Sequence, residues 1–169
     1  MLPIVSPYMD FLEYAKAALL DEVSELSEEQ LRWRMEPNGL SIKEILFFLG
    51  DLEEMYLNHY SSTLTEDKPS IAFLNEEAIS REKNYLDQDI VPAKLRLEEL
   101  RGENLSLLRT VRGREWVRVA QFTGNVHPLN RQVEPDMVTL AKLCEWHAKQ
   151  MKKYLEQIRR TKARILEEA

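Results

Sequence analysis

The chain has 169 residues, of which 44% are hydrophobic and 31% charged, and its formal net charge is −6. This length predicts one domain over residues 1–169 that buries a sizeable core without disulfides or metals. The acidic balance, with charges of both signs interspersed, disfavours non-specific nucleic-acid binding, because neutralising phosphates requires clustered Lys and Arg.

The single cysteine, Cys144, cannot form an intrachain disulfide, which is typical of a reducing compartment. No apolar run has the length of a membrane span, and residues 1–11 lack the pattern of a signal peptide. The sequence therefore favours a cytoplasmic protein with no membrane partner.

Helical periodicity dominates from residue 7 onward. A first helix is predicted for residues 7–25 and a short second one for 26–35 with Ser27 as cap, followed by a Pro-Gly turn at 36–39 in which glycine can adopt a positive φ. Ser41 and Glu44 then form a capping box that opens a long amphipathic helix, which we expect to end near Tyr60, with a loop after it.

A third helical region is predicted for residues 75–111, with a bend or break near 88–92 because of Pro92. Leu95 is among its expected apolar contacts, and Gly102 indicates a close backbone approach, since glycine weakens a helix. Residues 113–136 form the longest irregular segment.

The last helix is expected from Asp136 or Thr139 to Glu167, and its periodicity predicts one buried side. That side consists of Leu140, Leu143, Cys144, His147, Met151, Tyr154, Leu155 and Ile158. Four long helices with short satellite helices and no sheet predict an all-α four-helix bundle. The long loops leave crossover topologies open.

Four segments resemble the DinB/YfiT-like superfamily of helical bundles: "PNGLSIKEILFFLGDLEEMYLNHY", "LEELRGENLSLLRTV", "GREWVRVAQFTGNVHPLNRQV" and "EWHAKQMKKYLEQIRR". The resemblance implies an up-down-down-up topology, homodimers, and a divalent metal such as Zn or Ni held by three histidines. Characterised members include thiol-dependent transferases and isomerases that act on small electrophiles.

The three implied histidine positions fall at Phe48, His147 and Met151, so one of three ligands is retained. A shifted register would place the C-terminal pair at Gln150 and Tyr154 and retain none. Phenylalanine offers no donor, methionine suits zinc and nickel poorly, and both fill cores well. We therefore expect no metal or other cofactor, with His147 as a weak candidate ligand.

The candidate cavity comprises His147, Met151, Phe48, His127 and Arg101. His147 is interpreted as a core histidine, with a general base as the functional alternative. His127 either ties down its loop or borders the cavity mouth. Arg101 either points an anion-binding guanidinium inward or pairs on the surface with Glu98 or Glu103.

Two further groups complete the candidates. Asp51, Glu53 and Glu54 are interpreted as a solvated acidic patch, with carboxylate ligands as the alternative. Cys144 precedes His147 by three residues, so the two could touch as an activated thiol pair. A buried structural cysteine is the other interpretation.

The catalytic residues cannot be assigned from the sequence. The first hypothesis is a metal-free DinB-like binding or assembly module that forms a homodimer and accepts a small-molecule ligand. The alternative is a metal- or thiol-dependent transferase or hydrolase of the superfamily that acts on a small molecule, a hypothesis that rests on fold-level resemblance.

Overall fold

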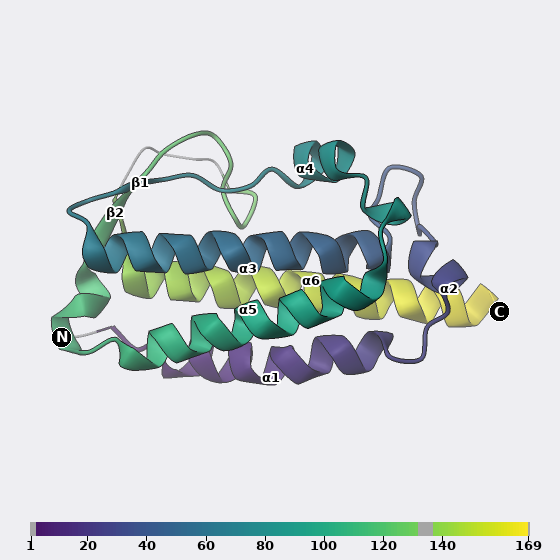
Figure 1. Cartoon of the computed structure of the whole chain (residues 1–169), viewed down its shortest axis with the longest axis horizontal. Coiled ribbons are helices and arrows are strands. Elements are labelled where there is room, and N and C mark those ends of the chain that lie inside the picture. Colours follow the sequence, from purple (N-terminus) through teal and green to yellow (C-terminus); the bar gives the residue numbers. More distant parts are fainter. Residues whose placement is uncertain (1–2, 132–136, 169) are drawn as a thin grey trace.

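The computed structural model describes residues 3–131 and 137–168. Its four long helices are α1 (Ser6–Val23), α3 (Ile42–Thr65), α5 (Ile90–Thr110) and α6 (Leu140–Glu168). Figure 1 shows that α1 and α6 run in one direction while α3 and α5 run in the other. The predicted four-helix bundle with up-down-down-up topology is thereby confirmed.

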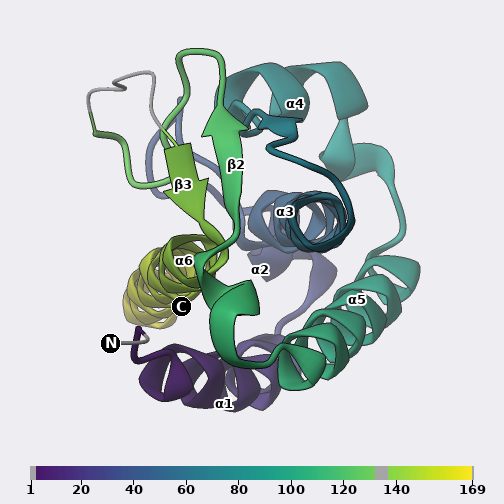
Figure 2. The ribbon, with the colours of Figure 1, turned by 90° about the vertical axis from the view of Figure 1, so that its left-hand side faces the viewer.

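Each long helix packs on two others. α5 lies between α1 and α3, and α6 closes the ring between α3 and α1, as Figure 2 shows from one end. All eight positions predicted for the inward side of α6 are buried. The described helices include none that is long and apolar enough to cross a membrane.

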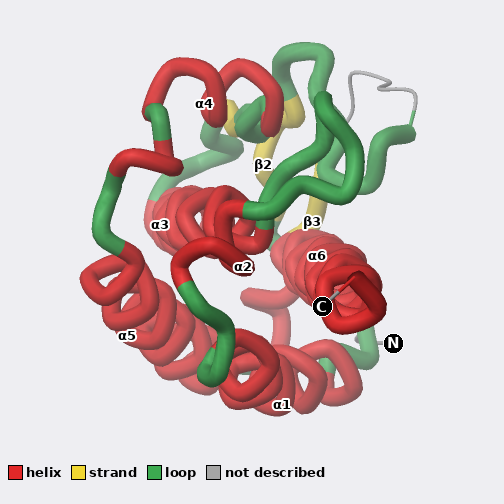
Figure 3. The backbone as a smooth tube through the Cα atoms, turned by 90° about the vertical axis from the view of Figure 1, so that its right-hand side faces the viewer, coloured by secondary structure: helices red, strands yellow, loops and turns green. Residues whose placement is uncertain are grey.

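Short helical segments connect the long ones: α2 (Glu28–Arg32), α4 (Glu76–Lys83) and the 3-10 turns η1 (Tyr85–Asp87) and η2 (Gly113–Val117). Seen from the opposite end, α2 lies at the end of the bundle where the chain passes from α1 to α3 (Figure 3). Ser27 caps α2 as predicted.

The predicted interruption before the third long helix is present, between α4 and α5. Asn84 has a φ of 48°, in the left-handed region, and ends α4. Pro92 lies within the first turn of α5, where its missing N–H breaks no hydrogen bond.

Several local predictions were wrong. α3 continues past Tyr60 to Thr65, so the loop after it starts five residues later than expected. A Cβ added at Gly102 would meet no atom within 4 Å, and Leu95 is 62% exposed. The turn at 36–39 is present, with the Gly39 amide donating to the Glu36 carbonyl at 3.0 Å, but Gly39 does not adopt a positive φ.

A small sheet, which the sequence did not predict, joins the two long connections. It contains β1 (Ser70–Ile71), β2 (Val119–Phe122) and β3 (Met137–Thr139) in that order. β1 pairs parallel with β2, and β2 pairs antiparallel with β3, with Ala120 opposite Val138. Strands of two to four residues contain too few alternating positions to predict a sheet from the sequence.

The helix α3, which supplies most of the candidate site, has a strong local start. The Ser41 hydroxyl accepts from the Glu44 amide at 3.1 Å, and the Glu44 carboxylate accepts from the Ser41 amide at 3.0 Å. Arg34 donates two hydrogen bonds of 2.9 Å to the same carboxylate. The cap is buried, so its loss leaves polar groups unpaired inside the protein.

We predict that Ser41→Ala lowers the free energy of unfolding by about 1–2 kcal/mol in urea titrations. Ser27→Ala is the matched control, because it removes an equivalent capping box from the exposed five-residue α2. The control should cost less than the test variant. An equal effect of the two changes would contradict a special role for the α3 start.

Candidate functional site

His147 lies on α6 with its side chain completely removed from solvent. Its Nε2 is 2.6 Å from Oε2 of Glu53, and its Nδ1 is 2.9 Å from the hydroxyl of Tyr60. The ring of Tyr56 stacks on the imidazole with centroids 4.1 Å apart. Three side chains of α3 therefore occupy both nitrogens and one face of His147.

Glu53 is the centre of the arrangement. Its Oε1 accepts from Nε of Arg101 at 2.6 Å and from the side-chain amide of Asn104 at 3.1 Å. Asn104 also donates to the Glu53 main-chain carbonyl, at 2.9 Å. The Glu53 carboxylate is thus held by three side chains from two other helices, and we call Glu53, Arg101, Asn104 and His147 the core cluster.

The core cluster also contacts α1, through Arg101. A terminal N–H of its guanidinium donates to the main-chain carbonyl of Leu12 on α1, at 3.2 Å. Arg101 is 1% exposed and points inward, which decides between the two orientations predicted for it. Contacts of this one cluster therefore join α1, α3, α5 and α6.

The charges in the core cluster balance. Burial alone would raise the pKa of the Glu53 carboxyl, but Arg101 and His147 outweigh it and lower that pKa to about 2. Burial lowers the pKa of His147, despite the neighbouring carboxylate. A neutral imidazole fits both contacts: Nε2–H donates to Glu53, and Nδ1 accepts from the Tyr60 hydroxyl.

The geometry also limits what His147 can do. A general base needs a free lone pair within reach of a substrate proton. The Nδ1 lone pair of His147 already receives the Tyr60 hydroxyl, and no part of the ring reaches solvent. In this conformation both ring nitrogens are engaged by neighbouring side chains, and neither is open to a substrate.

The other two implied metal positions carry no donor suited to a divalent ion. Phe48 is buried and packs edge-on against Tyr154, with ring centroids 5.8 Å apart, and Met151 is fully buried. Among the described residues, no group of three or more His, Cys, Asp or Glu side chains has an arrangement that could hold a metal ion. The residues at the three positions do not fit the site that the resemblance implies.

The two ligands implied by the alternative register, Gln150 and Tyr154, make other contacts in the structure. The Gln150 side-chain oxygen accepts from the Tyr56 hydroxyl at 2.7 Å, and the Tyr154 hydroxyl donates to Glu76 at 2.5 Å. Glu76 begins α4, so this second contact fastens the connection between α3 and α5 to α6.

His127 lies apart from the core cluster. Its ring meets Trp146 edge-on at 4.7 Å, and its Nδ1 accepts from the amide of Leu129 at 3.0 Å. These contacts support the interpretation that His127 ties down its own loop. Burial and the nearby Arg131 lower the pKa of its imidazole.

The predicted solvated acidic patch was wrong for two of its three members. Glu53 is fully buried and Asp51 is 6% exposed, while only Glu54 lies mainly in solvent. Helical spacing assigned them to the surface because carboxylates are rarely buried without partners. Those partners, Arg101 for Glu53 and Arg96 for Asp51, are 48 and 45 residues away.

Cys144 is completely buried, in agreement with its structural interpretation. Burial raises the pKa of its thiol to about 12, so the nucleophilic thiolate is scarce at neutral pH. The described contacts of His147 do not include this sulfur.

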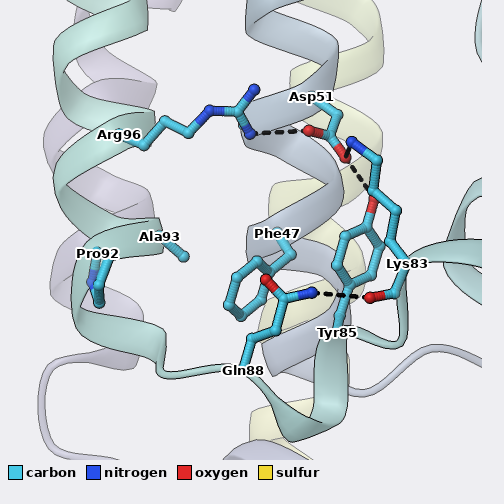
Figure 4. A pocket seen from close by; sticks show the side chains of 9 residues that line it. Phe47, Asp51, Lys83, Tyr85, Gln88, Pro92, Ala93 and Arg96 are labelled. Carbon is cyan, nitrogen blue, oxygen red and sulfur yellow. Dashed lines mark hydrogen bonds and ion pairs between the residues drawn. The ribbon is translucent and has the colours of Figure 1, made fainter.

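Of the five predicted cavity residues, the structure brings His147 and Arg101 together through Glu53. The pocket drawn in Figure 4, of about 220 Å³, is lined by none of the five. It lies between α3, α5 and the segment that joins α4 to α5.

Sequence reasoning missed Tyr56, Tyr60 and Asn104 as partners in and around the core cluster, although the tyrosines lie on the apolar stripe of α3.

We predict strong coupling between Glu53 and Arg101. Glu53→Gln or Arg101→Met alone leaves a buried charge unpaired and should cost about 3–5 kcal/mol of unfolding free energy, whereas the double variant should cost less than the sum. The matched control is the Glu13–Arg109 pair, which joins α1 and α5 at 2.8 Å but is more than half exposed. Its cycle should give at most about 1 kcal/mol. Additive losses at Glu53 and Arg101 would contradict the pairing.

We also predict that acid destabilises the protein through His147. Because its folded pKa lies below the ordinary value, the unfolded chain binds the proton more readily, and the unfolding free energy falls as pH falls below about 6.5. Loss of the Glu53 contribution follows between pH 4.5 and about 2. Urea titrations from pH 8 to 5 should show a shallower slope for His147→Gln, which keeps one donor and one acceptor. If His127→Gln made the dependence of unfolding free energy on pH shallower and His147→Gln did not, the assignment to His147 would be contradicted.

The comparisons with known proteins agree with this fold. A model of the DinB superfamily matches residues 12–168. YfiT of Bacillus subtilis (strain 168), a protein named as a candidate metal-dependent hydrolase, is 26% identical over 144 residues, which are 83% of this chain and 76% of YfiT. A solved YfiT structure, described as an unusual four-helix bundle, matches with a TM-score of 0.72 at 24% identity over 92% of this chain and 86% of that one. The chain belongs to the DinB superfamily.

Proposed function

We propose that this chain is a DinB superfamily bundle in which core packing has replaced the three-histidine metal site, and that it acts as a binding or assembly module. The observation that carries the proposal is the closed set of contacts around His147. Glu53 and Tyr60 engage both nitrogens at 2.6 and 2.9 Å, and Tyr56 covers one face.

The two missing ligands support the same conclusion. A catalytic zinc site needs about three protein donors and an open position for water or substrate. Phe48 supplies an apolar ring and Met151 a thioether, and each is less than 2% exposed. A cation beside His147 would also have to displace the charge-balanced contact with Glu53, which Arg101 already neutralises.

A metal- or thiol-dependent hydrolase or transferase is the second candidate. Its support is the name of the Bacillus subtilis relative, together with the histidine that this chain keeps at position 147. Such an activity would need the bundle to open around His147, because the imidazole is fully enclosed. Use of Cys144 as the nucleophile would need the same opening, because its thiol is equally enclosed.

The proposal includes a homodimer in the cytoplasm. Exposed apolar side chains on the first and last helices, Tyr14 at 53% and Leu166 at 58%, offer contact area for a second copy. The lone cysteine is consistent with a reducing compartment.

We predict that protein purified without a histidine tag contains no stoichiometric divalent metal by elemental analysis. Zn²⁺ and Ni²⁺ should leave the melting temperature unchanged, because neither ion finds three donors in the folded state. Treatment with EDTA should be equally without effect. A stoichiometric ion that EDTA removes, with a fall in melting temperature, would contradict the proposal. Stabilisation by low-molecular-weight thiols would favour the second candidate.

A further inference from the structure

The pocket in Figure 4 is separate from the core cluster and has a polar and an apolar side. Asp51, Lys83 and Arg96 form the polar side, while Phe47, Pro92 and Ala93 supply apolar walls. The Gln88 amide, which donates to the Lys83 main-chain carbonyl at 2.7 Å, also lines the pocket. Its volume of about 220 Å³ is below the roughly 300–1,000 Å³ of typical ligand sites, so it suits a small molecule.

The polar side is built around a buried carboxylate. Oδ1 of Asp51 accepts from Arg96 at 2.8 Å, and Oδ2 accepts from Lys83 at 3.2 Å and from the Tyr85 hydroxyl at 2.5 Å. Burial acts to raise the pKa of Asp51, but hydrogen bonds from Tyr85, Arg96 and Lys83 outweigh it and lower that pKa. Two cations therefore face one ionised carboxylate, and the lining carries a net positive charge.

The two cations also have donors to spare. Lys83 and Arg96 line the pocket and are 45% and 40% exposed, so both remain accessible to solvent. An ammonium group has three N–H donors and a guanidinium has five. Apart from Asp51, the only side chain among the described residues that pairs with either is Glu54, which meets Arg96 and is 57% exposed. A pair so exposed contributes little and is readily exchanged.

Gly50 on α3 leaves space for the Arg96 side chain. A Cβ at Gly50 would lie 3.1 Å from a terminal nitrogen of Arg96, so the absence of a side chain lets the guanidinium lie close against the helix. Glycine in a helix interior costs about 1 kcal/mol relative to alanine. The close approach predicted for Gly102 is found at Gly50 instead.

The apolar walls suit a compact, flat body. The rings of Phe47 and Tyr85 are stacked with centroids 5.3 Å apart and planes 15° apart, which fixes the Phe47 wall. Figure 4 shows Pro92 and Ala93 across the pocket from Phe47. Apolar walls beside a few placed polar groups are what orient small ligands.

We propose that this pocket binds a small organic monoanion, a carboxylate with a flat apolar body. The ligand carboxylate meets the free donors of Lys83 and Arg96, and the body lies between Phe47 and Pro92. This inference goes beyond the proposed function, because it concerns residues outside the core cluster and holds whether or not a metal binds at His147.

The test is titration of the ¹⁵N-labelled full chain with benzoate, followed by amide chemical shifts. Benzamide, of the same shape without the charge, is the comparison ligand at equal ionic strength. We expect saturable shifts at Phe47, Ala93 and Arg96 with benzoate and about tenfold weaker binding of benzamide. Equal affinities, or no saturable shifts with benzoate, would overturn the proposal.

Two variants locate the binding. Lys83→Met should weaken benzoate about tenfold, whereas Lys152→Met, an exposed change on α6, should not. Ala93→Phe should abolish binding by filling the pocket, and Ala163→Phe on the surface of α6 should leave it intact. If Ala93→Phe fails to fold, the benzoate affinity of Lys83→Met still tests the proposal. Benzoate affinity unchanged in Lys83→Met would overturn the proposal, and metal analysis of the same sample tests the proposed function separately.

Discussion

One ionised carboxylate inside the bundle, that of Glu53, constrains the position of all four long helices. A charge removed from water is costly unless it is paired and hydrogen-bonded. Arg101 and Asn104 meet this requirement from α5, and His147 meets it from α6. Arg101 extends the contacts to α1 at Leu12. A shift of any helix along its axis would break a buried polar contact, whereas apolar contacts alone would tolerate it better.

The contacts of Glu53 also limit the reactions in which His147 can take part. His147 donates to Glu53 and accepts from Tyr60, so its neighbours use the two atoms that could bind a metal or move a proton. Phe48 and Met151 add apolar volume where the resemblance implies ligands. The apolar side chains at these two positions and the contacts of His147 both agree with the proposal of a metal-free bundle. Ligand binding is then expected at a different place, such as the pocket beside Asp51.

The sequence predicted what local periodicity determines. The capping box at Ser41 and the inward side of α6 were correct, because both depend on spacing within a few turns. The partners of Glu53 and Asp51 were missed, since the residues that pair with them lie at least 32 positions away and helical spacing places carboxylates outside by default. The three short strands escaped prediction because their pairing, and not their sequence, defines them.

A measurement of the protonation state of His147 tests the hydrogen bonds assigned to the core cluster most directly. Nitrogen chemical shifts of ¹⁵N-labelled histidine distinguish a protonated nitrogen from one that accepts a hydrogen bond. We expect that at pH 7 His147 is neutral, with the proton on Nε2 and with Nδ1 accepting, and that neither Zn²⁺ nor EDTA changes its signals. A doubly protonated imidazole, or a signal that shifts when metal is added or removed, would contradict it.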